Sequence, residues 1–179
     1  MKGIMFNTRY GLEQAVLLGN KTRTWRADKN PRFKVGEIVA IKQSYKQLII
    51  AQTKEWLYEK GLLANIPGEG EIIPLAYLQS AGYNNKMFVR PELMPHHIRI
   101  TAIKPCRLQD ITREECLREG IIYLEDLKMF YFQRLDEEGF YFRHPKDAFA
   151  SLINKLSGRD YKDSNPHGYA YEFELITEN

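Results

Sequence analysis

Basic side chains gather within residues 21–34, where only Asp28 is acidic. The basic residues of this segment are Lys21, Arg23, Arg26, Lys29, Arg32 and Lys34. Ammonium and guanidinium groups bind phosphate oxygens through charge-assisted hydrogen bonds. The segment therefore favours a ligand that carries phosphate, and a solvated basic loop is the plainer interpretation.

Two aromatic runs form a second group of residues with binding chemistry. Phe130-Tyr131-Phe132 and Phe140-Tyr141-Phe142 are followed closely by Arg134 and Arg143. Aromatic rings beside arginine can stack on nucleic-acid bases. Three consecutive aromatics must also place some rings inward on a strand. We therefore expect these runs mainly to form alternating sheet core.

Metal and cofactor chemistry finds little support in the residue pattern. His96 and His97 are adjacent, and neighbouring side chains diverge on a strand, so we expect no metal site there. Cys106 and Cys116 form neither a disulfide framework nor a zinc-binding spacing. No glycine-rich phosphate loop or Ser-His-Asp order is present, and we predict no cofactor.

Composition indicates a soluble globular protein. The 179 residues are 44% hydrophobic and 27% charged, with a formal net charge of +3. This small excess does not favour a protein that depends on nonspecific phosphate contacts. Residues 1–10 lack the apolar run of a signal peptide, and no stretch is apolar enough to span a bilayer. We therefore expect a cytoplasmic protein without a membrane partner.

Several segments have clear secondary-structure signals. Helical spacing predicts a helix over 11–18, ended by Gly19. Thr112 and Glu115 have the spacing of a capping box, and Gly120 ends the short helix that follows. Pro145 opens another helix, which Gly158 closes. Alternation or β-forming residues predict strands at 37–41, 98–106 and 169–175, and the turn residues 136–139 predict a hairpin between the aromatic runs.

These elements predict an α+β fold of one domain over 1–179, a small curled mixed or antiparallel β-barrel with flanking short helices. Strict strand–helix alternation, which a doubly wound parallel fold requires, is absent. Residues 44–97 are the least legible part, with a helix expected at 53–63, a turn at 67–70 and a short strand at 86–89. We interpret about 44–97 as an insertion on the core.

Four ordered pieces of the chain resemble the ASCH family, a relative of the PUA RNA-binding fold. Gly19-Asn20-Lys21-Thr22-Arg23-Thr24-Trp25-Arg26 is similar to the signature Gly-x-Lys-x-x-Thr-x-Arg of that family. The other pieces are Val35-Gly36-Glu37, then Leu108 to Thr112 with Glu119-Gly120-Ile121, and Asn165-Pro166 before the final strand. The resemblance runs from about Met5 to Leu175, outside the insertion. His167 departs from it, because many relatives carry Trp there.

The resemblance implies a PUA-like barrel that binds RNA or modified nucleotides in a cleft beside the signature loop. It suggests Asn20, Arg23 and Arg26 as ligand-binding residues. One branch of small bacterial ASCH proteins deacetylates 4-acetylcytidine, and its catalytic Lys, Thr and Glu match Lys21, Thr24 and Glu119 here. These three residues are accordingly the candidate catalytic set.

Amide hydrolysis by this set would have Thr24 as the nucleophile and Lys21 as the base, with Glu119 assisting proton transfer. Lys21 must then be neutral, which burial and the charges of Arg23 and Arg26 favour. Lys21 and Thr24 converge only if the segment is a turn or carries a bulge. Glu119 lies at the negative end of its helix, where a carboxylate is disfavoured, and residues that break a local rule are often functional. The alternative is an exposed glutamate without a role.

The sequence therefore predicts binding of RNA or of a modified nucleoside or nucleotide. The first alternative is a 4-acetylcytidine amidohydrolase. The second is an adaptor that binds a protein partner through the insertion. The residues leave open the identity of the ligand, whether it is a nucleoside or a polymer, and the oligomeric state.

Overall fold

The computed structural model describes residues 1–68, 70–134 and 137–177. Contacts divide the chain into two compact units, which we call unit 1 (1–5 and 39–97) and unit 2 (6–38 and 98–179). Both contain helices and strands, so the α+β class is confirmed. Strand pairing among the described residues does not close a barrel.

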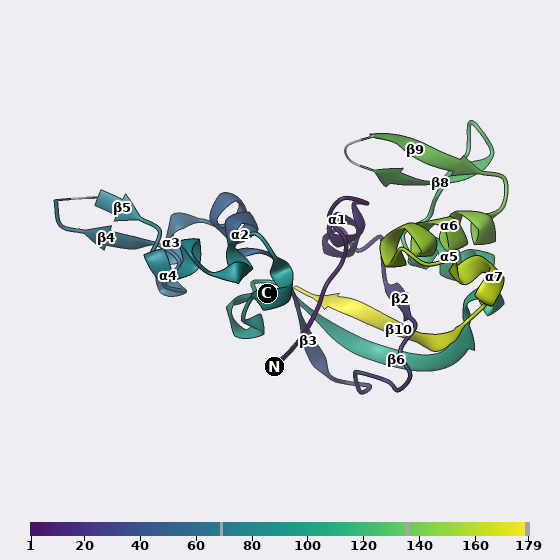
Figure 1. The fold of residues 1–179 in the computed structure, drawn as a ribbon, viewed down its shortest axis with the longest axis horizontal. Coiled ribbons are helices and arrows are strands. Elements are labelled where there is room, and N and C mark those ends of the chain that lie inside the picture. Colours follow the sequence, from purple (N-terminus) through teal and green to yellow (C-terminus); the bar gives the residue numbers. More distant parts are fainter. Residues whose placement is uncertain (69, 135–136, 178–179) are drawn as a thin grey trace. The chain divides into compact units, whose positions relative to one another are not determined.

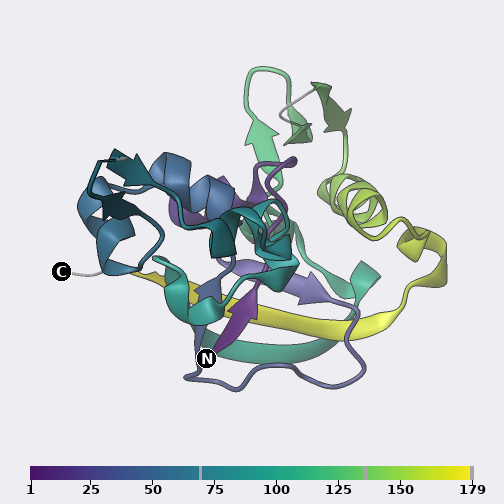
Figure 2. The same ribbon diagram turned by 60° about the vertical axis from the view of Figure 1, so that its left-hand side comes forward.

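Unit 2 contains the signature segment and most of the remaining chain. Its elements are α1 (Leu12–Leu17), β2 (Arg23–Arg26), β6 (His97–Arg107, whose first residue belongs to unit 1), the 3-10 turn η4 (Leu108–Asp110), α5 (Arg113–Arg118), β7 (Ile122–Leu124), β8 (Met129–Arg134), β9 (Glu137–Phe142), α6 (Pro145–Ser157), α7 (Tyr161–Ser164) and β10 (His167–Ile176). β10 lies between β6 and β2, and β8 lies between β7 and β9 in a separate sheet. Figure 1 shows α5, α6 and α7 together on one side of β6, β10 and β2, and Figure 2 shows β10 and β6 running side by side.

The expected elements of unit 2 are largely present. The capping box of α5 forms as predicted, since Thr112 Oγ1 accepts a hydrogen bond from the Glu115 N–H and Glu115 Oε2 accepts one from the Thr112 N–H. Helix α6 begins at Pro145 and ends at Gly158, whose φ of 66° is left-handed. The aromatic runs pair antiparallel as β8 and β9. The turn expected at 136–139 is wrong over 137–139, which belong to β9, and Asp136 lies outside the described residues.

β10 approaches β2 closely because position 168 is glycine. The two strands pair antiparallel with Tyr169 opposite Arg26 and Tyr171 opposite Thr24. A Cβ at Gly168 would lie 2.3 Å from the Arg26 carbonyl oxygen and 2.6 Å from the Trp25 ring. Any larger residue would therefore separate the strands beside the signature segment.

Unit 1 has a hydrophobic core of its own. Its elements are β1 (Lys2–Ile4), β3 (Ile38–Ile41, whose first residue belongs to unit 2), α2 (Tyr45–Ala51), α3 (Lys54–Glu59), β4 (Ala64–Ile66), β5 (Gly70–Ile72), α4 (Leu75–Leu78), and the 3-10 turns η1 (Ala81–Tyr83), η2 (Lys86–Phe88) and η3 (Pro91–Leu93). β1 and β3 pair in parallel, and β4 and β5 pair antiparallel. The buried cluster comprises Ala40, Tyr45, Leu48, Leu57, Leu62, Val89 and Met94.

Unit 1 also corrects part of the sequence analysis. The strand expected at 86–89 is wrong, because Lys86–Phe88 forms a 3-10 turn in which Asn85 accepts a hydrogen bond from the Met87 N–H. Helix α2 was not foreseen, although Ser44 and Gln47 form a capping box at its start. Ile50, Leu75, Met87 and Phe88 are exposed. Docking of a protein partner through this region stays a prediction.

Candidate functional site

The backbone of the signature segment is held by three other elements of unit 2. The Lys21 N–H donates to the Ala15 carbonyl at the end of α1, and the Thr22 N–H donates to the Arg118 carbonyl in α5. The Phe173 N–H in β10 donates to the Thr22 carbonyl. These hydrogen bonds fix the residues just before β2 against the end of α5. Lys21 and Glu119, far apart in sequence, are thereby brought together.

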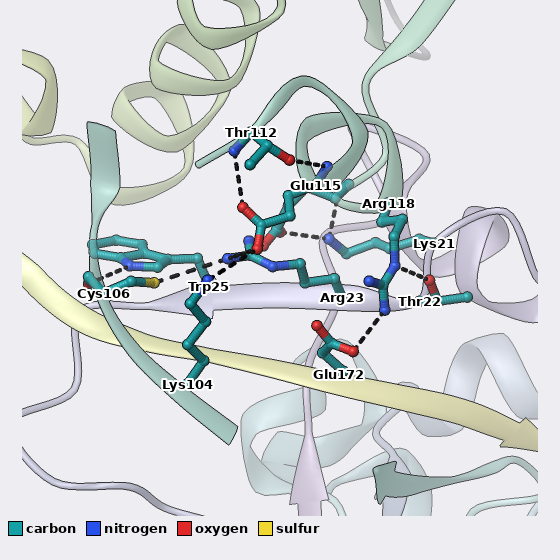
Figure 3. Close-up of polar contacts among 11 residues, drawn as sticks. Lys21, Thr22, Arg23, Trp25, Lys104, Cys106, Thr112, Glu115, Arg118 and Glu172 are labelled. Atoms are coloured by element: carbon teal, nitrogen blue, oxygen red, sulfur yellow. Dashed lines mark hydrogen bonds and ion pairs between the residues drawn. The ribbon is translucent and has the colours of Figure 1, made fainter. Parts of the chain in front are cut away.

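The Glu119 carboxylate is the centre of a buried network of charges. Figure 3 shows Lys21, Arg23 and Glu115, which belong to this network. Lys21 Nζ lies 3.0 Å from Glu119 Oε2, and Arg23 Nη1 lies 2.7 Å from Glu119 Oε1. The exposed fractions of Lys21, Arg23 and Glu119 are only 2%, 1% and 2%. The alternative of an exposed glutamate is therefore wrong.

Glu119 also holds Lys21 through its main chain. The ammonium donates to the Glu119 carbonyl oxygen over 2.6 Å. Glu119 is the C-terminal cap of α5, where unpaired carbonyls and the helix dipole make the potential negative. A cation at this position is favourable for the helix end and for the carboxylate alike. Two cations thus offset the unfavourable place of Glu119.

Gly120 makes room for this arrangement. Its φ of 101° is left-handed, and a Cβ would lie 3.0 Å from Leu12 and 3.7 Å from the Lys21 side chain. Glycine adopts this backbone without strain. The chain can therefore turn directly after Glu119 while the Lys21 side chain passes alongside.

A second carboxylate extends the network toward the surface. Glu115 Oε1 lies 3.6 Å from Arg23 Nη2 and 3.8 Å from Lys104 Nζ. Burial raises the pKa of Glu115, but the Thr112 N–H and the charges of Arg23 and Lys104 outweigh it and hold the pKa below its ordinary value. Glu115 is therefore an anion that balances the buried guanidinium.

The polar groups of Arg23 are not all satisfied. Nη2 lies 3.9 Å from Cys106 Sγ, a long and weak contact. Within the described part of the chain, Arg23 Nε is buried without a hydrogen-bond partner. An unpaired buried N–H costs about 1–3 kcal/mol. The network is thus strongly paired at one carboxylate and incomplete at its edge.

Burial lowers the pKa of Lys21. The Glu119 charge and hydrogen bond oppose this effect, and the charges of Arg26 and Arg23 reinforce it. Burial likewise lowers the pKa of Arg26, and Glu119 again opposes it. Arg26 therefore lies close enough to interact electrostatically with both Lys21 and Glu119.

Thr24 belongs to the other face of β2. Alternation puts Arg23 and Trp25 on one face and Thr24 and Arg26 on the other. Trp25 Nε1 donates to the Cys106 carbonyl, on the face of the charge network. No hydrogen bond joins the side chains of Thr24 and Lys21, both of which the structure describes. Thr24 is buried opposite Tyr171, so the structure does not show it paired with the proposed base.

The remaining predicted residues lie at the rim. Arg26 is half-buried opposite Tyr169, and Asn20 is exposed just before Lys21. Segment 27–34 is held over the same face, since the Tyr171 hydroxyl donates to Asp28 and accepts from the Arg32 N–H. The Phe33 ring packs edge-on against Tyr171, with centroids 5.2 Å apart.

Sequence reasoning missed three contributors. From the sequence, Glu115 is assigned only to a capping box, and Cys106 only to the end of a strand. Arg118 was not considered, yet its Nε donates to Thr22 Oγ1 and its Nη2 lies 3.0 Å from Glu172 Oε2. One turn of α5 separates Glu115 from Glu119, and this spacing could have indicated two carboxylates on one helix face.

Within the described ranges, no group of three or more His, Cys, Asp or Glu side chains could hold a metal ion. None of the described helices combines the length and apolar character that a bilayer crossing requires.

No family model, curated protein or solved structure was found to match the chain. The resemblance to the ASCH family therefore stays a prediction.

Proposed function

We propose that unit 2 binds RNA or a modified nucleoside or nucleotide on the Thr24 face of β2. The observation that carries this proposal is the cross-strand pair of Arg26 and Tyr169. Directly opposite residues of antiparallel strands project to the same face. His167 projects there too, two residues before Tyr169, with the two ring centroids 5.9 Å apart.

This group of side chains suits a nucleotide. Arg26 and Tyr169 are half-buried and His167 is exposed, so each retains accessible surface. Aromatic side chains stack on unpaired bases, and a guanidinium can stack or bind phosphate. Arg26 is the partly accessible cation beside Tyr169, and its guanidinium is complementary to a phosphate.

The PUA-like fold and ASCH membership are parts of the same proposal. They rest on the ordered motifs around Lys21, Thr24 and Arg26. In this interpretation His167 takes the place of the tryptophan found in many relatives. A smaller ring beside Tyr169 would accept a different base surface, so we expect the choice of ligand to depend on this position.

The test is calorimetric titration with cytidine, 4-acetylcytidine, cytidine monophosphate and a short single-stranded RNA. Tyr169→Leu should weaken binding of a stacked base by about 1–3 kcal/mol, or about 5- to 150-fold. Arg26→Gln should weaken binding of the monophosphate more than binding of the nucleoside, because the substitution removes the proposed phosphate contact. The matched control is Arg99→Gln, which removes an exposed arginine that pairs with exposed Glu174 in the same unit. Equal affinities for all four proteins would refute the site.

A second candidate function is amide hydrolysis of 4-acetylcytidine. The observation that favours it is the burial of Lys21, which lowers the pKa of its ammonium and so favours a base. Thr24 would attack the acetyl carbonyl and its proton would pass to Lys21. Lys21 would then give this proton to the amide nitrogen as the C–N bond breaks and cytidine leaves, and water would hydrolyse the acetyl ester on Thr24 to acetate. The absence of a Thr24–Lys21 hydrogen bond means that the ligand must bring these groups within reach.

Release of cytidine, followed by chromatography, decides this candidate. Thr24→Val should abolish release, whereas Thr24→Ser should retain part of it because a hydroxyl remains. Lys21→Met should also abolish release while the fold is retained, as checked by circular dichroism. Binding without release by the native protein would leave the binding function alone.

A further inference from the structure

The exposed face of the β7-β8-β9 sheet in unit 2 carries paired tyrosines. Tyr131 and Tyr141 stand directly opposite each other on β8 and β9. Their ring centroids are 5.7 Å apart and their planes differ by 19°. The exposed fraction of Tyr141 is 49%, and Tyr131 is half-buried.

The opposite face of this sheet is already covered. Phe130 and Phe132 are buried there. Arg113 of α5 lies over the Phe130 ring, and Lys155 of α6 lies over the Phe140 ring at 4.1 Å. Figure 1 shows α6 beneath β8 and β9. The phenylalanines thus fill the interior, and the tyrosine hydroxyls need not be buried.

The chemistry of the tyrosine face is aromatic, apolar and basic. Ile122 lies opposite Tyr131 with 44% of its surface exposed. Gln133 and Arg143 are exposed two residues beyond Tyr131 and Tyr141, respectively. The side chains of this face that the structure describes include no carboxylate. The exposed Arg143 guanidinium is complementary to a phosphate.

The tyrosine rings also pack over a bare stretch of backbone. A Cβ at Gly139 would lie 3.3 Å from the Tyr131 ring and 3.6 Å from the Tyr141 ring. Glycine at this position lets both rings lie against the strand. Because their positions are supported from below, the rings lose little further freedom when a base stacks on them, which is favourable for binding.

We infer that this face is a stacking platform for single-stranded RNA, with bases on Tyr131 and Tyr141 and a phosphate on Arg143. This inference rests on the proposed function and makes it more specific, since a free nucleoside cannot occupy both sites. Stacking on aromatics tolerates different bases, because every base has a π face. The platform therefore supplies affinity for a polymer rather than recognition of one nucleotide.

The experiment compares binding of oligo(C) RNA ten nucleotides long with binding of cytidine monophosphate. Tyr141→Leu should weaken RNA binding about 5- to 150-fold and leave the affinity for the monophosphate unchanged. Arg143→Gln should reduce the slope of log K against log salt by roughly 0.7, the value for one phosphate contact on a single strand. Tyr58→Leu is the matched control, an exposed tyrosine of unit 1. Thermal melts confirm that each variant folds.

The outcomes separate this inference from the proposed function. RNA binding that survives Tyr141→Leu and Tyr131→Leu together overturns the platform, as does a native protein that binds no RNA. Loss of RNA binding in these variants, with the monophosphate still bound, supports it. Tyr169→Leu could leave the affinities for both ligands unchanged while Tyr141→Leu weakens RNA binding. In that case the platform is supported and the site on the Thr24 face is refuted.

Discussion

The two faces of β2 differ in how deeply their cations are buried. On one face Arg23 joins Lys21 at the Glu119 carboxylate, almost completely removed from water. On the other face Arg26 stays half-buried opposite Tyr169. β2 thus carries a desolvated cation, Arg23, on one face and a partly accessible cation, Arg26, on the other, three residues apart. The residues of segment 19–26 therefore divide between a buried charge network and the partly accessible face on which we propose that the ligand binds.

We call the Arg23 side of β2, with Lys21 and Glu119, the closed face. Loss of the Glu119 carboxylate should lower the free energy of unfolding more than any other predicted change. Glu119→Ala leaves the Lys21 ammonium and the Arg23 guanidinium without their shared anion. Breaking a buried pair from one side costs about 3–5 kcal/mol, because the remaining charge is unpaired. Urea unfolding should show a loss of this size in the free energy of unfolding.

The matched control for this prediction is Glu172→Ala. Glu172 pairs with Arg118 near the same helix, but both side chains are partly exposed. Such pairs are worth about 0–1 kcal/mol. Equal losses in the two variants would mean that the Glu119 face is no more closed than the surface, and the comparison would fail.

The boundary between the faces depends on the close contact at Gly168. Gly168→Ala places a methyl group against the Arg26 carbonyl and the Trp25 ring. Overpacking of this kind costs about 1–3 kcal/mol. The strands should separate locally, so binding at Arg26 and Tyr169 should weaken as well.

Gly139→Ala serves as the control in a different sheet. Its new methyl would lie 3.3 Å from the Tyr131 ring, a milder contact than those with the Arg26 carbonyl and the Trp25 ring at Gly168. Unfolding free energies and cytidine monophosphate affinities of both variants are compared. If Gly168→Ala is stable and binds normally, the close approach of β10 does not position the site.

The sequence predicted local elements better than the pairing of charges. Caps and periodicity located α5, α6 and β10, because Thr112, Pro145 and alternating aromatics act within a few residues. The sequence marked Lys21 and Glu119 as candidates, but their contact depends on packing of α5 against the chain before β2. Arg23 was expected at a ligand and instead contacts Glu119 and Glu115. Alternation at Arg23 and Thr24 was visible in the sequence, whereas the element that covers each face was not.

The smallest expected effect concerns the proton of Lys21. A pKa lowered from its ordinary value of 10.5 means that the unfolded chain binds this proton more tightly than the native protein. As pH rises from the folded pKa toward 10.5, the native protein should gain stability relative to Lys21→Met. The gain cannot exceed about 1.4 kcal/mol per pH unit for one proton. Below the folded pKa both states are protonated, and the difference should be flat.

Urea unfolding of both proteins between about pH 7 and 10.5 measures this difference. Lys104→Met, which removes an exposed lysine from the same network, subtracts the effect of losing one positive charge. A difference that falls with rising pH would reverse the sign. Glu119 would then hold the ammonium charged more strongly than burial opposes it. In that case Lys21 belongs wholly to the closed face as a structural cation, and amide hydrolysis with Lys21 as the base loses its physical support.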